Sequence, residues 1–248
     1  MDRWQNKVAV VTGASAGIGA ACVLYLLKNG MIVVGLARRL ERMEKIRSDL
    51  TREQQKRFHT MRCDVSKEAD ILEAFKWVES KLGGVDVLVN NAGIIRERTL
   101  LTNPNNSADL KAIIDTNVIG VAFCTREAFQ SMKKRGVDGH IMIINSIAGH
   151  TVPIVKNMSM NIYPASKHAI TAMTEVLRQE LLLQETRIKI TSISPGAVDT
   201  EIMTQSGIKH EFPMLRSEDI ADAVIYCLQT PPNVQIHEMI IKPIGEMF

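Results

Sequence analysis

The chain has 248 residues, enough for one large α/β domain over residues 1–248, and nothing in it forces a second. A formal charge of +3 on scattered residues argues against a nucleic-acid partner, and no apolar run approaches the roughly 20 residues of a membrane span. The four cysteines lack metal-ligand spacing and no signal peptide is visible, so we expect reduced thiols, no metal site and a cytoplasmic protein.

Short apolar segments alternate with longer amphipathic ones. In chain order we expect strand Lys7–Thr12, helix Gly17–Asn29, strand Met31–Ala37, strand Phe58–Cys63, helix Lys67–Leu82, strand Val85–Val89, helix Ser107–Lys134, strand His140–Asn145, helix Tyr163–Gln184, strand Ile188–Ile193, helix Ser217–Leu228 and strand Ile236–Ile241. Continuously apolar strands separated by helices predict a parallel sheet of about seven strands, covered on both faces in a doubly wound Rossmann fold. The irregular segments at about 94–106, 149–162 and 201–213 are expected as substrate loops near the carboxyl ends of the strands.

A glycine-rich loop, Thr12–Gly19 (TGASAGIG), joins the first strand to the first helix. Glycines let the backbone approach a pyrophosphate, and the helix N-terminus supplies amide donors. The spacing G-x3-G-x-G differs from the commoner G-x-G-x-x-G, and a lone glycine cluster is more often a plain turn. Its place in the first βαβ unit favours dinucleotide binding.

The end of the second strand indicates which dinucleotide is bound. An NAD site usually carries an acid there, which holds the ribose 2′-hydroxyl. Here Ala37 is followed by Arg38 and Arg39, whose guanidiniums suit a 2′-phosphate. We therefore expect NADP(H), the alternative being an exposed basic helix start. Asp64, after the third strand, is expected near the adenine amino group.

Tyr163 and Lys167 (YPASK) lie four residues apart, on one face of a predicted helix. A cation near a phenol lowers the pKa of the phenol toward the range where general acid–base catalysis is efficient. Pro164 is compatible with a helix that begins at Tyr163. Taken alone, the pair is a common helix pattern.

In this order the motifs resemble those of the short-chain dehydrogenase/reductase family over nearly the whole chain. The matching segments are TGASAGIG at Thr12–Gly19, NNAG at Asn90–Gly93, Asn117 within DTNVIG, Ser146 within INSIAG, YPASK at Tyr163–Lys167 and SPG at Ser194–Gly196. Within the family, the chain resembles insect farnesol dehydrogenase-like proteins and a vertebrate keto-steroid reductase relative. The segments that carry this narrower resemblance are MDRW at the start, CTREAFQSMK at Cys124–Lys133, LRQEL at Leu177–Leu181 and AVIYCLQTP at Ala223–Pro231.

The resemblance implies reversible hydride transfer between NADP(H) and a lipophilic alcohol or carbonyl. It implies that Tyr163 donates or accepts the proton and that Lys167 lowers the pKa of Tyr163 and binds the nicotinamide ribose. It further implies that Ser146 polarises the substrate oxygen and that Asn117 holds a proton-relay water. Without the other motifs, Ser146 would be a turn cap and Asn117 a poor helix residue.

The glycine loop, the two arginines and the family motifs together predict a cofactor site. Its expected members are Gly13, Ser15, Ala16, Gly17, Ile18, Gly19, Arg38, Arg39, Asp64, Val65, Asn91, Gly93, Tyr163, Lys167, Pro195, Gly196, Val198 and Thr200.

The substrate site is expected at the irregular segments, next to the catalytic hydroxyls. Its predicted members are Ser146, Tyr163, Ile95, His150, Val152 and Met203, with Ile94, Met158, Met160 and Met214 as further wall candidates. Thioethers adapt to irregular apolar ligands, so a farnesol-like isoprenoid or a steroid is plausible, although methionines also fill cores.

The retained motifs bear on whether the protein is an enzyme. The alternative to an enzyme is a catalytically silent NADPH-binding sensor or structural subunit, but such proteins usually lose the tyrosine, lysine or serine that this chain retains.

The predicted helices Ser107–Lys134 and Tyr163–Gln184 carry more apolar residues than one sheet face needs. In the family these helices pair between subunits, which implies a homodimer or homotetramer.

Overall fold

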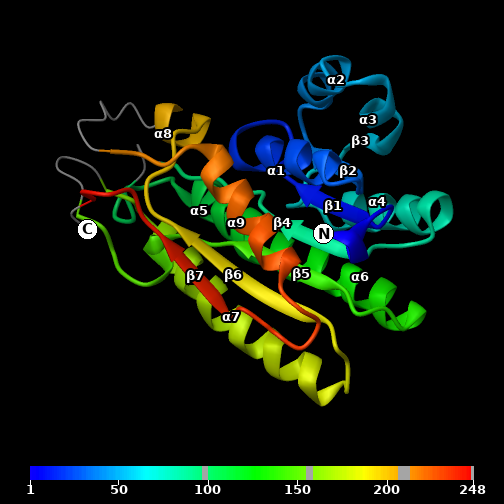
Figure 1. Ribbon diagram of the computed structural model, residues 1–248. Helices are drawn as coiled ribbons and strands as arrows, with labels where there is room; N and C mark the ends of the chain where they lie inside the picture. The colour runs from blue at the N-terminus through cyan, green and yellow to red at the C-terminus, as the bar shows by residue number, and fades with distance from the viewer. Residues whose placement is uncertain (97–99, 155–158, 206–212, 247–248) are drawn as a thin grey trace.

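Seven parallel strands form the central sheet of the computed structural model, which describes residues 1–96, 100–154, 159–205 and 213–246. The strands are β1 (Val8–Thr12), β2 (Ile32–Ala37), β3 (Phe58–Arg62), β4 (Val87–Asn90), β5 (His140–Ile144), β6 (Lys189–Pro195) and β7 (Glu238–Ile241). Their order is β3-β2-β1-β4-β5-β6-β7, with every neighbouring pair parallel (Figure 1). The predicted doubly wound parallel sheet is confirmed.

Both faces of the sheet are buried. Successive side chains of a strand point to opposite faces, so β1 sends Ala9 and Val11 into one core and Val8 and Val10 into the other. Every residue of β1 is buried. This double burial explains why the central strands are continuous apolar runs in the sequence.

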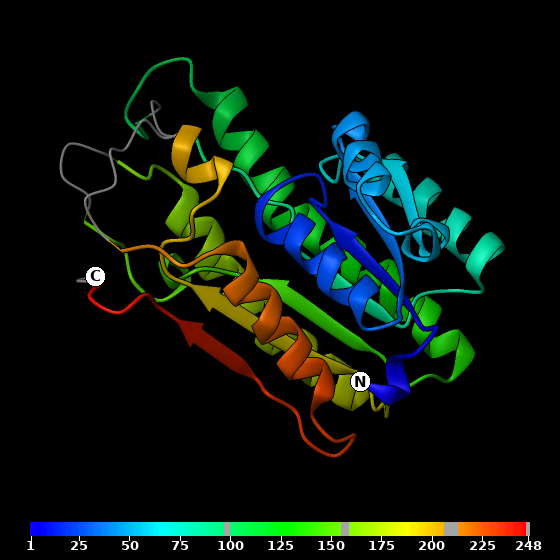
Figure 2. The same cartoon turned by 45° about the horizontal axis from the view of Figure 1, so that its top comes forward.

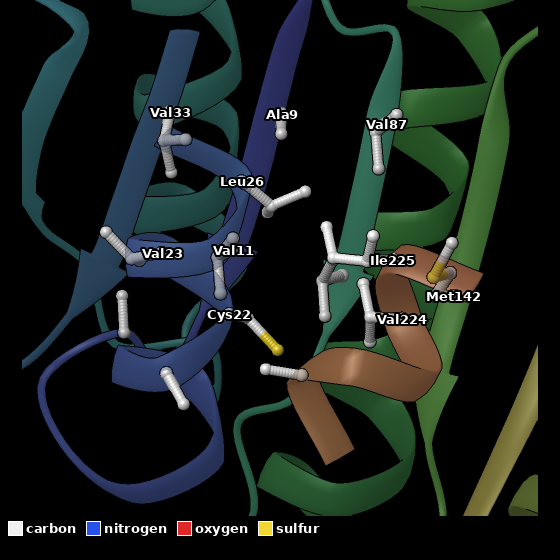
Figure 3. Packing of buried hydrophobic residues seen from close by; sticks show 14 of the residues in the cluster. Ala9, Val11, Cys22, Val23, Leu26, Val33, Val87, Met142, Val224 and Ile225 are labelled. Atoms are coloured by element: carbon white, nitrogen blue, oxygen red, sulfur yellow. The ribbon is translucent and has the colours of Figure 1, made fainter. Parts of the chain in front are cut away.

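Helices cover each face of the sheet. The longer ones are α1 (Gly17–Lys28), α4 (Glu68–Leu82), α6 (Gly120–Arg135), α7 (Tyr163–Leu183) and α9 (Ser217–Gln229). α1 and α9 pack together on one face, where Cys22 and Val224 are fully buried (Figure 3). α4, α6 and α7 cover the other face, with Ile71 and Ile170 in its core. Among the described residues, no helix combines the length and the apolar character that a membrane crossing requires.

Three short helices were not predicted. α2 (Leu40–Ser48) and α3 (Arg52–Arg57) lie between β2 and β3, and α8 (Glu201–Gln205) lies inside the segment 201–213 that was expected to be a loop. α3 buries no residue and shows no apolar periodicity. α2 carries apolar residues three apart, at Leu40, Met43 and Ile46, but it buries only Met43, and this short pattern was overlooked. α8 is too short for a periodic pattern to develop.

The single helix predicted over Ser107–Lys134 is interrupted. α5 (Ser107–Ile114) and α6 are joined by a π-helical turn, η2 (Asp115–Ile119). Such turns are rare and frequently lie at functional sites. Asn117 is in this turn, so the poor helix former predicted to be catalytic coincides with the local break in regular α-helix.

The strand order reverses between β1 and β4, because β2 and β3 lie on one side of β1 and β4 to β7 on the other. Open α/β sheets bind ligands beside the carboxyl ends of the strands at such a point. In Figures 1 and 2, α5, α8 and the C-terminal segment lie on the side of the sheet where the strands end. A ligand site is therefore expected at this edge.

Candidate active site

A cleft of about 580 Å³ lies at the carboxyl edge of the sheet. The structure brings most of the predicted cofactor and catalytic residues onto its walls. These are Gly13, Ser15, Ala16, Gly17, Ile18, Arg38, Arg39, Asp64, Val65, Asn91, Gly93, Ser146, Tyr163, Lys167, Pro195, Gly196, Val198 and Thr200. Two predicted residues, Gly19 and Asn117, lie behind the walls rather than on them.

The glycine loop fits the pyrophosphate of a dinucleotide. Gly13 has a φ of 68°, which side-chain-bearing residues rarely adopt, and its N–H donates to the Leu36 carbonyl at 2.8 Å. A Cβ on Gly19 would lie 2.3 Å from the Gly13 carbonyl oxygen, so a side chain there would displace the loop. α1 begins at Gly17 without a side-chain cap from any described residue, which leaves its first N–H groups available to an anion.

Asn91, after β4, braces the glycine loop. Its Nδ2 donates to the carbonyl oxygens of Thr12, at 2.9 Å, and Gly13, at 3.3 Å. In return, the Thr12 hydroxyl accepts from the N–H groups of Asn91 and Ala92, both at 3.0 Å. Asn91 lines the cleft, and its predicted part in binding the cofactor stays a prediction.

Two arginines follow β2 at the end of the cleft expected for the adenosine. Arg38 is exposed and makes no hydrogen bond or ion pair with any described residue. Arg39 donates from Nε and Nη2 to the Ser15 hydroxyl, at 3.4 and 3.3 Å, and from Nη1 to Glu201 Oε2 at 2.7 Å. Both guanidiniums are thus within the region where a 2′-phosphate would need cations.

The segment after β3 forms another part of this end. Asp64 and Val65 both line the cleft, as predicted. The Asp64 carboxylate accepts from the N–H of Ser66 at 3.1 Å and from its hydroxyl at 2.8 Å through one oxygen, Oδ1. The predicted acceptance from an adenine amino group stays a prediction.

Tyr163 and Ser146 place two hydroxyls together on the cleft wall. Tyr163 is the first residue of α7, where Pro164 fits the first turn without loss of a hydrogen bond. Ser146 precedes the short helix η3 (Ile147–Gly149) and accepts from the Ala148 N–H at 3.1 Å. The Ser146 hydroxyl lies close enough to the Tyr163 hydroxyl to act on its pKa, which it lowers. A substrate oxygen beside them would meet two preorganised donors.

Lys167 follows Tyr163 by one helical turn, but its ammonium points to the end of β5. Nζ lies 5.8 Å from the centre of the Tyr163 ring and donates to the carbonyls of Ile144, at 3.0 Å, and Asn145, at 3.2 Å. An ammonium has three donors. The third is left for the cleft, which Lys167 lines, so the geometry accommodates the predicted contact with a ribose.

The predicted lowering of the Tyr163 pKa by Lys167 is wrong for this structure. Burial raises the pKa of the phenol above its ordinary value of 10, and the Ser146 hydroxyl opposes this only in part. Burial also lowers the pKa of Lys167 to about 8. The phenol therefore keeps its proton at neutral pH, which is the form that donates to a carbonyl oxygen.

Asn117 ties three elements together from behind the cleft. Its Oδ1 accepts from the Ile94 N–H at 2.9 Å, and its Nδ2 donates to the Ile94 carbonyl at 2.9 Å and to the Ser166 hydroxyl at 3.2 Å. Asn117 is buried. The side chain thus fixes the segment after β4 against α7, and its predicted role in a proton relay stays a prediction.

Apolar side chains also line the cleft. Ile94, Ile95, Met160 and Met203 line it as predicted, together with Pro153 and Ile202, which were not predicted. Met158 lies outside the described residues. Met214 does not line the cleft.

His150 and Val152 are not on the cleft wall, where the sequence predicted them. His150 Nε2 hydrogen-bonds with Glu238 Oε1 of β7 at 2.8 Å and with the Ser194 hydroxyl of β6 at 3.2 Å. These polar partners hold the imidazole against the sheet edge. Val152 is 66% exposed and faces solvent.

Glu201, the first residue of α8, lines the cleft but was missed by the sequence reasoning. Its carboxylate pairs with both Arg39 and Arg42. The sequence marks Glu201 only as an acid directly after Thr200, because its partners Arg39 and Arg42 lie far away in the chain.

Comparisons with known proteins agree with this geometry. A family model described as short chain dehydrogenase matches residues 7–211. Farnesol dehydrogenase of Aedes aegypti is 58% identical over 248 residues, 100% of both chains. Dehydrogenase/reductase SDR family member 11 of Homo sapiens is 41% identical over 254 aligned positions, covering 98% of this chain and 96% of that protein.

Two solved structures share the fold at full length. The closed form of serine dehydrogenase complexed with NADP+ has a TM-score of 0.85 at 27% identity, covering 97% of this chain and 96% of that one. An alcohol dehydrogenase from the archaeon Thermococcus sibiricus, complexed with 5-hydroxy-NADP, has a TM-score of 0.82 at 29% identity, covering 97% and 98%. The chain therefore belongs to the short-chain dehydrogenase/reductase family, whose members use NAD(P), and it is an oxidoreductase acting on CH–OH groups.

Proposed function

We propose that this chain is an NADP(H)-dependent oxidoreductase that reversibly transfers a hydride between NADP and a lipophilic alcohol or carbonyl. The observation that carries the cofactor choice is the presence of two guanidiniums in the cleft: Arg39, which donates to Ser15 of the glycine loop, and Arg38, which lines the same cleft. Ala37 stands where an NAD site usually carries an acid. The two similar structures, complexed with NADP+ and 5-hydroxy-NADP, support the same choice.

When bound, the nicotinamide supplies or accepts the hydride. In the proposed mechanism, the hydroxyls of Ser146 and Tyr163 bind the substrate oxygen. In reduction, Tyr163 donates its proton from Oη as negative charge develops on that oxygen. In oxidation, Tyr163 Oη accepts the proton of the alcohol, and it must be in the phenolate form to do so. Lys167 holds the ribose, and Asn117 is proposed to hold a water that passes protons to solvent.

The substrate class follows from the apolar part of the cleft wall. Ile95, Met160, Ile202 and Met203 present branched and thioether side chains that adapt to an irregular apolar ligand. The 58% identity to a farnesol dehydrogenase supports a farnesol-like isoprenoid alcohol, and a steroid fits the same chemistry.

Steady-state kinetics with NADP+ and NAD+ against farnesol, other isoprenoid alcohols and steroids tests the cofactor and substrate together. We expect kcat/KM at least tenfold higher with NADP+ and a smaller ratio for Arg38→Ala. Nearly equal efficiency with NAD+ would overturn the roles of Arg38 and Arg39.

The Tyr163→Phe variant tests the catalytic role. We expect kcat to fall by about 10²- to 10⁴-fold, since that is the usual contribution of a general acid. NADPH binding, followed by its fluorescence, should stay within twofold of wild type. A variant that turns over as fast as wild type would refute the assignment, whereas a wild-type protein that binds NADPH but turns over none of the tested substrates would favour the silent NADPH-binding alternative.

We also propose that the chain forms a homodimer or homotetramer in the cytosol. A groove of about 480 Å³ between α6 and α7 is lined by apolar side chains, including Phe129, Met173 and Leu177. Nearby Val176 and Leu183 are 52% and 80% exposed. A second subunit would cover these side chains, and light scattering of the purified chain measures the mass. The cytosolic placement is supported by four free, buried cysteines.

A further inference from the structure

Glu201 connects the two sides of the cofactor cleft. It begins α8, and its carboxylate receives Arg39 Nη1 at 2.7 Å on one oxygen and Arg42 Nη1 on the other. Arg39 follows β2 and Arg42 is on α2, so both partners belong to the adenosine side. In Figures 1 and 2, α8 and α2 lie on opposite sides of the loop that precedes α1.

The Arg39 guanidinium also faces the glycine loop. Arg39 directs Nε and Nη2 to the Ser15 hydroxyl and Nη1 to Glu201, so all three nitrogens have an acceptor. These two guanidiniums, Arg39 first, hold the pKa of Glu201 below its ordinary range, so the carboxylate is charged at neutral pH. The Glu201 carboxylate therefore places a negative charge beside Arg39, one of the two arginines on which the proposed choice of NADP depends.

We propose that Glu201 competes with the 2′-phosphate of the cofactor for Arg39 and Arg42, and so sets how strongly the cleft prefers NADP to NAD. This inference rests on the proposed use of NADP. A phosphate beside Ser15 would meet Nε and Nη2 of Arg39, whose Nη1 already pairs with Glu201. Two anions on one guanidinium repel each other. Arg38 is free of this competition, since it has no partner among the described residues.

The competition also reaches the substrate side. Ile202 and Met203 follow Glu201 on α8 and line the same cleft. A 2′-phosphate that draws Arg39 from Glu201 removes a contact that holds α8 in place. By thermodynamic linkage, a substrate that favours this position of α8 must weaken binding of the 2′-phosphate by the same factor.

Calorimetric titration of the purified chain with adenosine 2′,5′-bisphosphate and with 5′-AMP tests the proposal without turnover. Both ligands have the adenosine, and only the first has the 2′-phosphate. We expect Glu201→Gln to bind the bisphosphate about tenfold more tightly than wild type, with 5′-AMP unchanged within twofold. Glu41→Gln is the matched control: Glu41 is exposed on α2 next to Arg42, without a partner among the described residues. It should change neither affinity by more than twofold.

The outcomes separate this inference from the proposed function. Bisphosphate affinity that is unchanged or lower in Glu201→Gln overturns the competition, and a lower affinity would make the ion pair a support for the cofactor. An equal gain in Glu41→Gln also overturns it, because the effect would then be one of net charge. If wild type binds both ligands equally, the NADP preference fails, while a selective gain in Glu201→Gln would still support the role of Glu201.

Discussion

Lys167 should destabilise the fold at neutral pH, and the Lys167→Met variant tests this prediction. Lys167 is buried, with its ammonium against two carbonyls at the end of β5. Methionine has a similar length and fills the space without a charge. The variant removes the cost of burying the ammonium, together with the two hydrogen bonds that the ammonium donates.

The size of the effect follows from the pKa. Burial lowers the pKa of Lys167 from 10.5 to about 8, so between these pH values the unfolded chain holds a proton that the folded protein has released. Wild-type stability therefore rises with pH across this window, by roughly 3 kcal/mol in all. The lost hydrogen bonds cost the variant about 1 kcal/mol each. We expect the variant to be about 1 kcal/mol more stable than wild type near neutral pH and about 2 kcal/mol less stable above the window.

Urea unfolding followed by tryptophan fluorescence, repeated across the window, measures this difference. The chain has two tryptophans, and Trp4 is buried, so unfolding changes its surroundings. Lys134→Met is the control, because Lys134 is exposed and has no partner among the described residues. Its stability difference from wild type should not vary with pH. A difference between Lys167→Met and wild type that stays constant across the window would refute the burial cost.

Two further variants test residues that support the cleft from behind. Gly19→Ala should lower NADPH affinity at least tenfold, because the new Cβ would lie 2.3 Å from the Gly13 carbonyl oxygen, and a fluorescence titration with unchanged affinity would contradict this. Thr171→Val removes a hydroxyl that accepts from Asn145 at 2.9 Å and donates to the Gly149 carbonyl at 3.0 Å. We expect kcat to fall several-fold with NADPH affinity unchanged, since Asn145 and Gly149 flank Ser146, the proposed catalytic serine. A loss of cofactor affinity instead would contradict this role of Thr171.

The sheet could be predicted because its strands are buried on both faces. The expected strand Lys7–Thr12 is β1 (Val8–Thr12), which is buried throughout and therefore continuously apolar. The helices that were missed, α2 and α3, bury one residue or none, so no continuous apolar run marks them. α3 (Arg52–Arg57) buries no residue, and its capping box, in which the Thr51 hydroxyl accepts from the Gln54 N–H, is a local signal without an apolar face.

The site could be predicted where its residues lie in compact motifs, and not where it depends on distant pairings. Tyr163 and Lys167 share one helix, so their proximity follows from spacing alone. Arg39 and Glu201 are 162 positions apart, and only the folded sheet brings α8 over the adenosine side. His150 was misplaced for the same reason, since its partner Glu238 lies on β7, 88 positions away.

Spacing also predicts proximity better than it predicts charge. The i, i+4 relation places Tyr163 and Lys167 together, but burial acts on both groups and disfavours the charged form of each, raising the pKa of the phenol and lowering that of the ammonium. At neutral pH the phenol is therefore protonated, as carbonyl reduction requires. Oxidation needs the phenolate, and hence a positive charge beyond that of Lys167, which the oxidised nicotinamide ring would supply. The pKa shifts thus bear on the protonation state from which each direction of the proposed reaction starts.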